Sequence, residues 1–335
     1  MIDAKMKVIV EKVDSVEEYL EHWTRAMADV HWFKKGGLFD YNRDEMVEEI
    51  AGEFGQSGSI HLVAKSPSTA EILGVLGVKV RRDVGIFGRW EPAVPLKHRN
   101  GEAGKTLVKE AFSWLREKRV SKATCLLRFP HSRPETARWH MTLYRECGFV
   151  RRGLASVMLL ADLRKALMTA ERVENLRIVE GYDFSVEEYA DFTRRAYLST
   201  PEDRAIHGLD PSVSNPEENM RVLRAVKNGE YGFSPPECWK VAMLKDEVAG
   251  FIAAFMPESK CRPPHGVIAE LGIFPKFRRR GVGSVLIAAV HECFKNHERQ
   301  YSYVGTPKNN EPAIRLYRKA GYRPVFQIIN FEKTI

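Results

Sequence analysis

The spacing of hydrophobic and polar residues predicts that strands and amphipathic helices alternate along this chain. In the second half, Val267–Phe274 is a nearly continuous apolar run, which is typical of a strand buried on both faces. Trp239–Leu244 and Val248–Phe255 are two more strand-like segments, and the polar turn Lys245–Glu247 separates them. Both halves give the same order of strand, long helix, strands, helix, strand, helix and strand. This alternation predicts helices layered on a mixed sheet.

Segments of the first half recur in the same order in the second half. Ser15–Tyr19 (SVEEY) recurs unchanged as Ser185–Tyr189, and Leu143–Phe149 (LYRECGF) resembles Leu316–Tyr322 (LYRKAGY). An apolar helical pattern lies between these two segments in each half. Chance similarity between amphipathic helices is the alternative, but three matches in one order favour a duplication. In the second SVEEY copy, the serine can cap a helix and the second glutamate completes a capping box.

The length of the chain agrees with two domains. Its 335 residues can form two units of about 100–200 residues each. We expect a first domain at residues 1–163 and a second at residues 176–335. Residues 164–175 are charged and rich in good helix formers, so we expect a helical connector there.

The composition excludes several classes of protein. Hydrophobic residues make up 44% of the chain, which supports packed cores and excludes disordered chains. No apolar run approaches the ~18 residues that span a bilayer, and the N-terminus has no signal-peptide core. The cysteines are widely spaced without C-x-x-C, which argues against a disulfide framework or a zinc ribbon and suits a reducing cytoplasm. They are Cys125, Cys147, Cys238, Cys261 and Cys293.

The formal net charge of +8 favours a polyanionic partner. A phosphorylated cofactor, a nucleic acid and an acidic membrane surface all carry the required charge. A nucleic acid is the less favoured partner, because the chain has no recognisable nucleic-acid-binding motif.

A basic turn with glycines follows the apolar strand of the second half. The turn, Pro275–Ser284 (PKFRRRGVGS), leads into an apolar helical segment that begins at Val285. The first turn of a helix has unpaired N–H groups and a partial positive charge, and glycine lets an anion approach them. We therefore expect a phosphate or pyrophosphate here, and a plain basic surface turn is the alternative. A second candidate, Gly101–Thr106 (GEAGKT), lacks the earlier glycine of a nucleotide-triphosphate loop, because position 99 is Arg99.

The second half contains the motif R-x-x-G-x-G at Arg278–Gly283, followed by N-x-x-A-x-x-x-Y-x-x-x-G-Y at Asn310–Tyr322. Together these two motifs, in this order, resemble the GNAT superfamily of N-acetyltransferases. The resemblance covers the second half well and reaches the first half through the repeat. It implies tandem GNAT domains of the α/β (α+β) class. Each would have a mixed, mostly antiparallel central sheet flanked by helices, in three α-β-α layers.

The resemblance also implies an activity and a set of binding residues. The protein would be an N-acetyltransferase that uses acetyl-CoA as co-substrate, without a metal. It would transfer the acetyl group to a primary amine of a small molecule or peptide by direct attack in a ternary complex. The strand would pair with the pantetheine arm, the loop would bind the pyrophosphate, and the asparagine of the second motif would contact the cofactor. The implied residues are Leu271, Gly272, Ile273, Arg278, Arg279, Arg280, Gly281, Val282, Gly283, Ser284 and Asn310.

Two residues are candidates for catalysis. In the family, the tyrosine that corresponds to Tyr317 lies near the thioester sulfur and can protonate the leaving thiolate, and a core aromatic is the alternative. An amine with a pKa of about 10.4 must lose a proton before it attacks. Glu270 lies where many family members carry an acid, and burial would raise its pKa, so we expect it to act as the base. A glutamate that only orders neighbouring groups is the alternative. A backbone N–H near Ile273 would hold the oxyanion.

The two halves differ in the binding loop. Glu102 stands where the second half has Gly281, and Ala137 stands where it has Asn310. A carboxylate facing a pyrophosphate is repulsive by about a kcal/mol or more in a partly shielded site. We therefore expect the second half to be catalytic and the first half to be degenerate.

The acceptor is poorly specified by the sequence. Ser199–Glu237 contains acids and five prolines, and by resemblance it shapes the acceptor pocket, although we expect most of its acids in a solvated loop. Two other functions stay open, a catalytically silent acyl-CoA sensor or scaffold and, less favoured, a nucleic-acid-binding protein. We expect a cytoplasmic monomer or homodimer.

Overall fold

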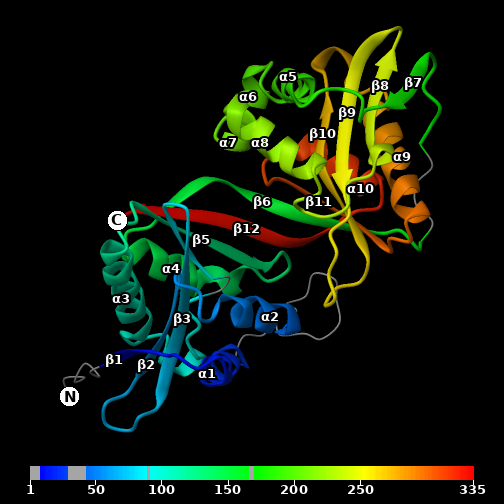
Figure 1. Ribbon diagram of the computed structural model, residues 1–335. Helices are drawn as coiled ribbons and strands as arrows, with labels where there is room; N and C mark the ends of the chain where they lie inside the picture. Colours follow the sequence, from blue (N-terminus) through cyan, green and yellow to red (C-terminus); the bar gives the residue numbers. More distant parts are fainter. Residues whose placement is uncertain (1–7, 29–42, 89–90, 166–169) are drawn as a thin grey trace. The chain divides into compact units, whose positions relative to one another are not determined.

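The structure, a computed structural model, describes residues 8–28, 43–88, 91–165 and 170–335. The chain forms two compact units, each described by itself below (Figure 1). Unit 1 comprises Met1–Arg152 and Phe326–Ile335, and unit 2 comprises Gly153–Val325. The units are therefore not two contiguous halves, because the last strand of each half folds with the other half. The predicted boundary near residue 163 separates the two copies of the repeat in the sequence, and as a domain boundary it stays a prediction.

Unit 1 contains a mixed sheet with the strand order β1-β2-β3-β4-β5-β12. The pair of β4 and β5 is parallel and the other pairs are antiparallel. The strands are β1 Ile9–Lys12, β2 Ser59–Lys65, β3 Ile72–Arg81, β4 Val84–Phe87, β5 Lys122–Pro130 and β12 Arg323–Thr334. Within unit 1, the C-terminal strand pairs over its residues Phe326–Thr334 with Lys122–Pro130 of β5.

Helices cover the sheet of unit 1. They are α1 Val16–Ala28, α2 Arg43–Glu53, α3 Ala103–Glu117 and α4 Arg138–Glu146. Both α1 and α3 pack against β3, and every residue of β3 from Leu73 to Val78 is buried. Tyr19 of α1 is fully buried, and so is Tyr189, the matching residue in the second copy of the repeat.

Unit 2 repeats this arrangement with the strand order β6-β11-β10-β9-β8-β7. Here the pair of β10 and β11 is parallel and the other pairs are antiparallel. The strands are β6 Val150–Asp162, β7 Leu176–Glu180, β8 Trp239–Leu244, β9 Glu247–Phe255, β10 His265–Ile273 and β11 Tyr301–Pro307. The prediction of mixed, mostly antiparallel sheets is confirmed for each unit.

The helices of unit 2 include the predicted long helices. They are α5 Val186–Tyr197, α6 Pro201–His207, α7 Pro211–Ser214, α8 Pro216–Lys227, α9 Val282–Asn296 and α10 Glu311–Lys319. The predicted capping box at the start of α5 is confirmed. The Glu188 N–H donates to Ser185 Oγ at 3.1 Å, and the Ser185 N–H donates to the Glu188 carboxylate at 2.7 Å.

The segment before β8 is not the solvated loop that we expected, because it contains α6, α7 and α8. Each of these helices has a proline in its first turn, where proline replaces an N–H that would have no intrahelical acceptor. The side chains of Thr200, Asp210 and Asn215 accept hydrogen bonds from the first turns as N-caps. The prolines and polar residues that suggested a loop are thus helix-start signals.

The segment between the two halves also differs from the prediction. Residues 170–175 contain no helix, and residues 166–169 of the expected helical connector lie outside the described residues. Asn175 has a φ of 58°, in the left-handed region, so the backbone does not continue as a right-handed helix there.

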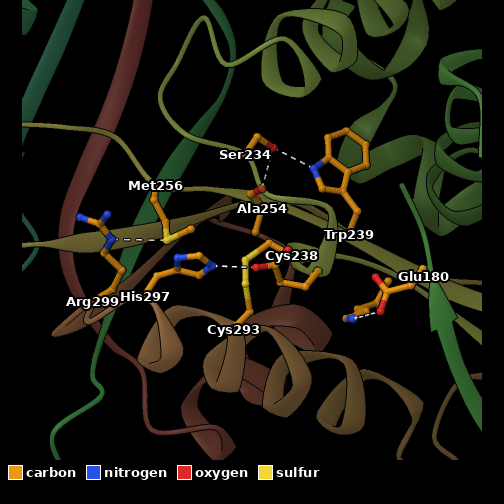
Figure 2. The surroundings of a disulfide bond; sticks show 11 residues. Glu180, Ser234, Cys238, Trp239, Ala254, Met256, Cys293, His297 and Arg299 are labelled. Carbon is orange, nitrogen blue, oxygen red and sulfur yellow. Dashed lines mark hydrogen bonds and ion pairs between the residues drawn. A yellow bond between two sulfur atoms is a disulfide. The ribbon is translucent and has the colours of Figure 1, made fainter. Parts of the chain in front are cut away.

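Cys238 and Cys293 form a disulfide, although the cysteine spacing argued against a disulfide framework (Figure 2). The two residues are 55 positions apart in the sequence, and only the packing of α9 against the start of β8 brings them together. Among the described residues, no helix combines the length and the apolar character needed to cross a membrane.

Candidate active site

Strands β10 and β11 of unit 2 separate part of the way along their length. Their parallel pairing runs from His265–Ile268 against Tyr301–Val304 and then stops. Beyond that point, Glu270–Ile273 continue to pair with β9, whereas the end of β11 pairs with β6. The register of β10 shifts between Ile268 and Glu270, which marks a bulge. One edge of Leu271–Ile273 is thereby released from the sheet.

A tyrosine from α5 occupies the released backbone edge. The Tyr197 hydroxyl donates to the Leu271 carbonyl at 2.7 Å and accepts from the Leu271 N–H at 3.1 Å. Both polar groups of this residue therefore point away from β9 and into the gap between the strands. A ligand with an amide could form the same two bonds if the tyrosine moved aside.

Helix α9 begins beside this gap with an unusual backbone conformation. Its N-cap, Gly281, has a φ of 83°, in the left-handed region that favours glycine. A Cβ at Gly283 would lie 2.8 Å from a methyl group of Leu316, so glycine permits the close packing of α9 on α10. The first-turn N–H groups of α9 face a site where an anion is stabilised by the helix dipole.

A cavity of about 460 Å³ lies along the strand edge and the start of α9. Its lining includes nine of the predicted binding and catalytic residues, namely Leu271, Ile273, Arg278, Arg279, Gly281, Val282, Gly283, Ser284 and Tyr317. Cationic side chains at Arg315 and Lys319 of α10 also line it. Gly272, Arg280, Asn310 and Glu270 are not among the lining residues.

Two predicted binding residues, Arg278 and Asn310, form hydrogen bonds that stabilise the fold around the cavity. The Arg278 guanidinium donates to the carbonyls of Ile273 and Ala196 and pairs with Asp203 at 3.0 Å, so it ties the loop to the helices before it. Asn310 caps α10, since its side chain accepts from the Ala313 N–H.

At Gly272, neighbouring side chains lie close to the backbone of β10. A Cβ there would lie 2.4 Å from the ring of Phe251 and 2.7 Å from Ala196. The bulge of β10 lies before Glu270 and not at Gly272.

Glu270 sits on the bulged part of β10 and is held by two side chains. The Thr193 hydroxyl donates to one of its oxygens at 2.5 Å, and the Asn219 amide donates to the other at 3.1 Å. Burial raises the pKa of Glu270 to about 7, and the two hydrogen bonds, which favour the carboxylate, oppose part of this rise. The carboxyl group can therefore accept or release a proton near neutral pH.

Tyr317 lies in α10 and faces the same cavity. Its side chain is 4% exposed, and burial raises the pKa of its hydroxyl, so the group stays protonated at neutral pH. Burial also raises the pKa of Tyr197, and the charges of Glu270 and Tyr317 add to that effect. The Tyr197 hydroxyl thus lies within the electrostatic reach of both predicted catalytic residues.

Sequence reasoning missed Thr193, Tyr197 and Asn219. A comparison of the two copies of the repeat could have drawn attention to the first two. Thr193 and Tyr197 align with Trp23 and Met27, which are buried apolar residues of α1.

Unit 1 has a carboxylate, Glu91, at the position that corresponds to Glu270 of unit 2, but this carboxylate is enclosed in the core. Glu91 accepts from the Tyr19 hydroxyl at 2.6 Å and from the Gly77 N–H at 2.6 Å, and burial raises its pKa to about 8. Tyr144, which matches Tyr317, donates its hydroxyl proton to the Glu91 backbone carbonyl. Both groups are therefore engaged within the core of unit 1.

The helix start of unit 1 is covered by an aromatic residue. A Cβ at Gly104 would lie 3.1 Å from the ring of Trp139, and the Trp139 indole donates to the Arg99 carbonyl at 2.8 Å. The Arg99 guanidinium lies over the same ring, 5.1 Å from its centroid. In unit 2, the residue that corresponds to Trp139 is a proline, at the second position of α10.

Comparisons with known proteins agree with this geometry. The acetyltransferase (GNAT) family model matches residues 204–322. A search of curated proteins found no match to the chain. A GCN5-related N-acetyltransferase from Sphaerobacter thermophilus has a similar structure, with a TM-score of 0.62 at 14% identity over 98% of this chain and 95% of that one.

Two further solved structures are similar over most of this chain. A tandem GNAT protein from the clavulanic acid biosynthesis pathway, solved without acetyl-CoA, has a TM-score of 0.53 at 15% identity, and the match covers 98% of both chains. The glucosamine N-acetyltransferase region of a fungal multi-domain β-N-acetylglucosaminidase has a TM-score of 0.61 at 15% identity, over 98% of this chain and 38% of that one. The acetyltransferase (GNAT) family model thus covers residues 204–322, and the fold of the chain as a whole is similar to that of a tandem GNAT protein.

Proposed function

We propose that unit 2 is an N-acetyltransferase that transfers the acetyl group of acetyl-CoA to a primary amine of a small molecule or peptide. The observation that carries the proposal is the cavity of about 460 Å³, in which a released strand edge, a helix start and a buried tyrosine meet. The acetyl transfer itself needs no metal.

The cavity offers a complementary group to each part of the cofactor. The N–H groups of Val282 and Gly283 and the dipole of α9 suit the pyrophosphate, whereas the Ser284 N–H already donates to the Gly281 carbonyl at 3.0 Å. The N–H and carbonyl of Leu271 suit the amides of the pantetheine arm once the Tyr197 hydroxyl releases them. Arg279, Arg315 and Lys319 supply positive charge for the remaining phosphate.

The transfer requires a neutral amine and a thiolate that can depart. Glu270 takes a proton from the bound ammonium group, directly or through water, because its pKa of about 7 keeps a useful fraction as carboxylate. The amine nitrogen then attacks the thioester carbon, and the backbone N–H groups at the end of β10 stabilise the oxyanion.

The attacking nitrogen, which is positively charged in the tetrahedral intermediate, loses its second proton to water. The C–S bond then breaks as the carbonyl forms again, which leaves a neutral amide and a thiolate. Tyr317 has a pKa raised above its ordinary value, which exceeds the value of about 8.5 for a thiol. It therefore donates a hydrogen bond to the departing sulfur, and solvent supplies the net proton.

The test is thiol release from acetyl-CoA in the presence of a panel of primary amines. We expect release with at least one amine, and a loss of about 10–100-fold in kcat for Tyr317→Phe. Tyr231→Phe is the matched control, because Tyr231 is 46% exposed and lies outside the cavity. Acetyl-CoA binding without turnover on any amine would favour the acyl-CoA sensor instead. Failure of coenzyme A to raise the Tm would contradict both.

A further inference from the structure

Three potential metal ligands meet at the end of α9 opposite the cavity, and a disulfide joins a fourth to them. Figure 2 shows this disulfide beside His297. Glu237 and Cys238 are adjacent in the 3-10 helix Pro236–Cys238 (η3), which leads into β8. Cys293 and His297 are four residues apart, in the last turn and at the C-cap of α9. A carboxylate oxygen of Glu237, the Cys293 Sγ and a ring nitrogen of His297 lie within 4.8 Å of one another. Cys238 Sγ joins them through the disulfide.

These side chains supply two sulfurs, one nitrogen and one oxygen. This is a donor set for tetrahedral Zn²⁺, whose bonds of about 2.0–2.3 Å place neighbouring ligand atoms about 3.3–3.8 Å apart. His297 Nε2 and the Glu237 carboxylate now lie 2.8 Å apart, so they would separate by less than about 1 Å to hold an ion between them. The two sulfurs can bind a metal only when the disulfide is reduced.

The surroundings hold the ligands in place. Cys238 is fully buried and Cys293 is 4% exposed. The neighbouring Trp239 is anchored, since its indole donates to Ser234 Oγ at 2.8 Å, and that hydroxyl donates to the Ala254 carbonyl at 3.1 Å (Figure 2). The partial negative charge at the C-terminus of α9 favours a cation beside it.

We propose that the reduced protein binds one Zn²⁺ through Glu237, Cys238, Cys293 and His297, and that the disulfide is the oxidised, metal-free form of this site. In the oxidation, hydrogen peroxide accepts two electrons from the two thiolates. The S–S bond forms, the O–O bond breaks, two protons from solvent complete two water molecules, and Zn²⁺ leaves. The site is structural and does not depend on the proposed acetyl transfer.

A metal here would connect α9 to the start of β8 in the same way as the disulfide does. Either form therefore fixes the helix whose other end lines the cavity. Reduction without a metal would leave two buried thiols and a His297–Glu237 pair as the remaining contacts. The reduced, metal-free protein should accordingly have the lowest Tm of the three forms.

Cobalt titration of the full chain tests the proposal directly. Co²⁺ is the probe, because tetrahedral cobalt with thiolate ligands gives intense visible bands and a near-ultraviolet charge-transfer band. We expect one equivalent to bind to phosphine-reduced wild type, Zn²⁺ to displace it, and peroxide-oxidised protein to bind none. Absence of the thiolate band in the reduced wild type would overturn the proposal, and this arm requires no variant to fold.

Two variants then identify the ligands. His297→Gln retains both cysteines, so its oxidised form should keep the wild-type Tm while the Co²⁺ affinity of its reduced form falls at least about tenfold. Cys147→Ser is the matched control, because Cys147 is a partly buried cysteine outside the disulfide, and it should retain the full cobalt spectrum. A thiolate–cobalt band that survives in Cys293→Ser would place the metal elsewhere and overturn the assignment.

Discussion

At the scale of single residues, our assignment of Glu270 as the base predicts how catalysis depends on pH. Its carboxyl group is buried against Thr193 and Asn219, and its pKa is raised to about 7. A base must be unprotonated to work, so kcat/KM should rise as the pH increases through about 7 and level off above it. The profile is measured by thiol release under saturating acetyl-CoA.

Glu270→Gln removes the base and keeps one acceptor oxygen for the two donors. We expect kcat to fall by about 10²–10⁴-fold and the rise near pH 7 to disappear, while coenzyme A still raises the Tm. Glu292→Gln is the matched control, because it makes the same chemical change at an exposed position of α9. An unchanged pH profile in Glu270→Gln would assign the base to another group.

At the scale of elements, the separation of β10 from β11 creates a backbone site that α5 closes. Tyr197 satisfies both polar groups of Leu271, so the binding mode that we propose for the pantetheine arm requires the arm to replace this hydroxyl. Tyr197→Phe should lower the stability of the ligand-free protein by about 1 kcal/mol. It should strengthen coenzyme A binding by up to about tenfold, because no bonds to the tyrosine need to break.

Calorimetric titration with coenzyme A and a thermal scan measure the two effects. Tyr301→Phe is the control, because its hydroxyl lies on an exposed part of β11 and accepts from Arg164. Weaker coenzyme A binding by Tyr197→Phe would show that the hydroxyl contacts the ligand and does not compete with it.

The loop before α9 allows a second test at this scale. Gly281→Asp introduces the kind of carboxylate that Glu102 supplies in unit 1, and at a residue with a φ of 83°. Repulsion and obstruction should weaken coenzyme A binding by about 10–100-fold. Gly229→Asp is the matched control, since Gly229 has a φ of 75° and lies outside the cavity. Equal losses in both variants would attribute the effect to folding.

At the scale of the whole molecule, the sequence predicted the strands and helices better than the contacts between distant segments. The repeat, the alternating apolar runs and the capping box at Ser185 report local geometry, so they predicted two similar mixed sheets. The pairing of the C-terminal strand with β5 depends on residues almost 200 positions apart, and no local signal encodes such a contact. The disulfide between Cys238 and Cys293 was missed for the same reason.

For the candidate site too, the sequence predicted the residues of a local motif and missed those that distant segments contribute. The glycines and basic residues of Pro275–Ser284 form a local pattern, and most of them line the cavity. Thr193, Tyr197 and Asn219 reach the site from α5 and α8, so only the tertiary structure brings them to β10. Asn310 has a recognisable motif position, but its side chain is already engaged, because the oxygen caps α10 and the nitrogen donates to Thr306 Oγ1 at 3.0 Å.

The differences between the units lead to a prediction for the complete chain. In unit 1, Trp139 covers Gly104, and the carboxylate of Glu91 is bonded to Tyr19 and Gly77 inside the core. In the part of the chain that the structure describes, the start of α9 lines an open cavity and the start of α3 is covered, so we expect one coenzyme A per chain. Calorimetric titration of wild type should give a stoichiometry near one, and Gly281→Asp should reduce that binding. Trp139→Ala should not add a second site, because Glu102 still opposes a pyrophosphate there. Two sites of equal affinity in wild type would contradict the assignment of binding to unit 2.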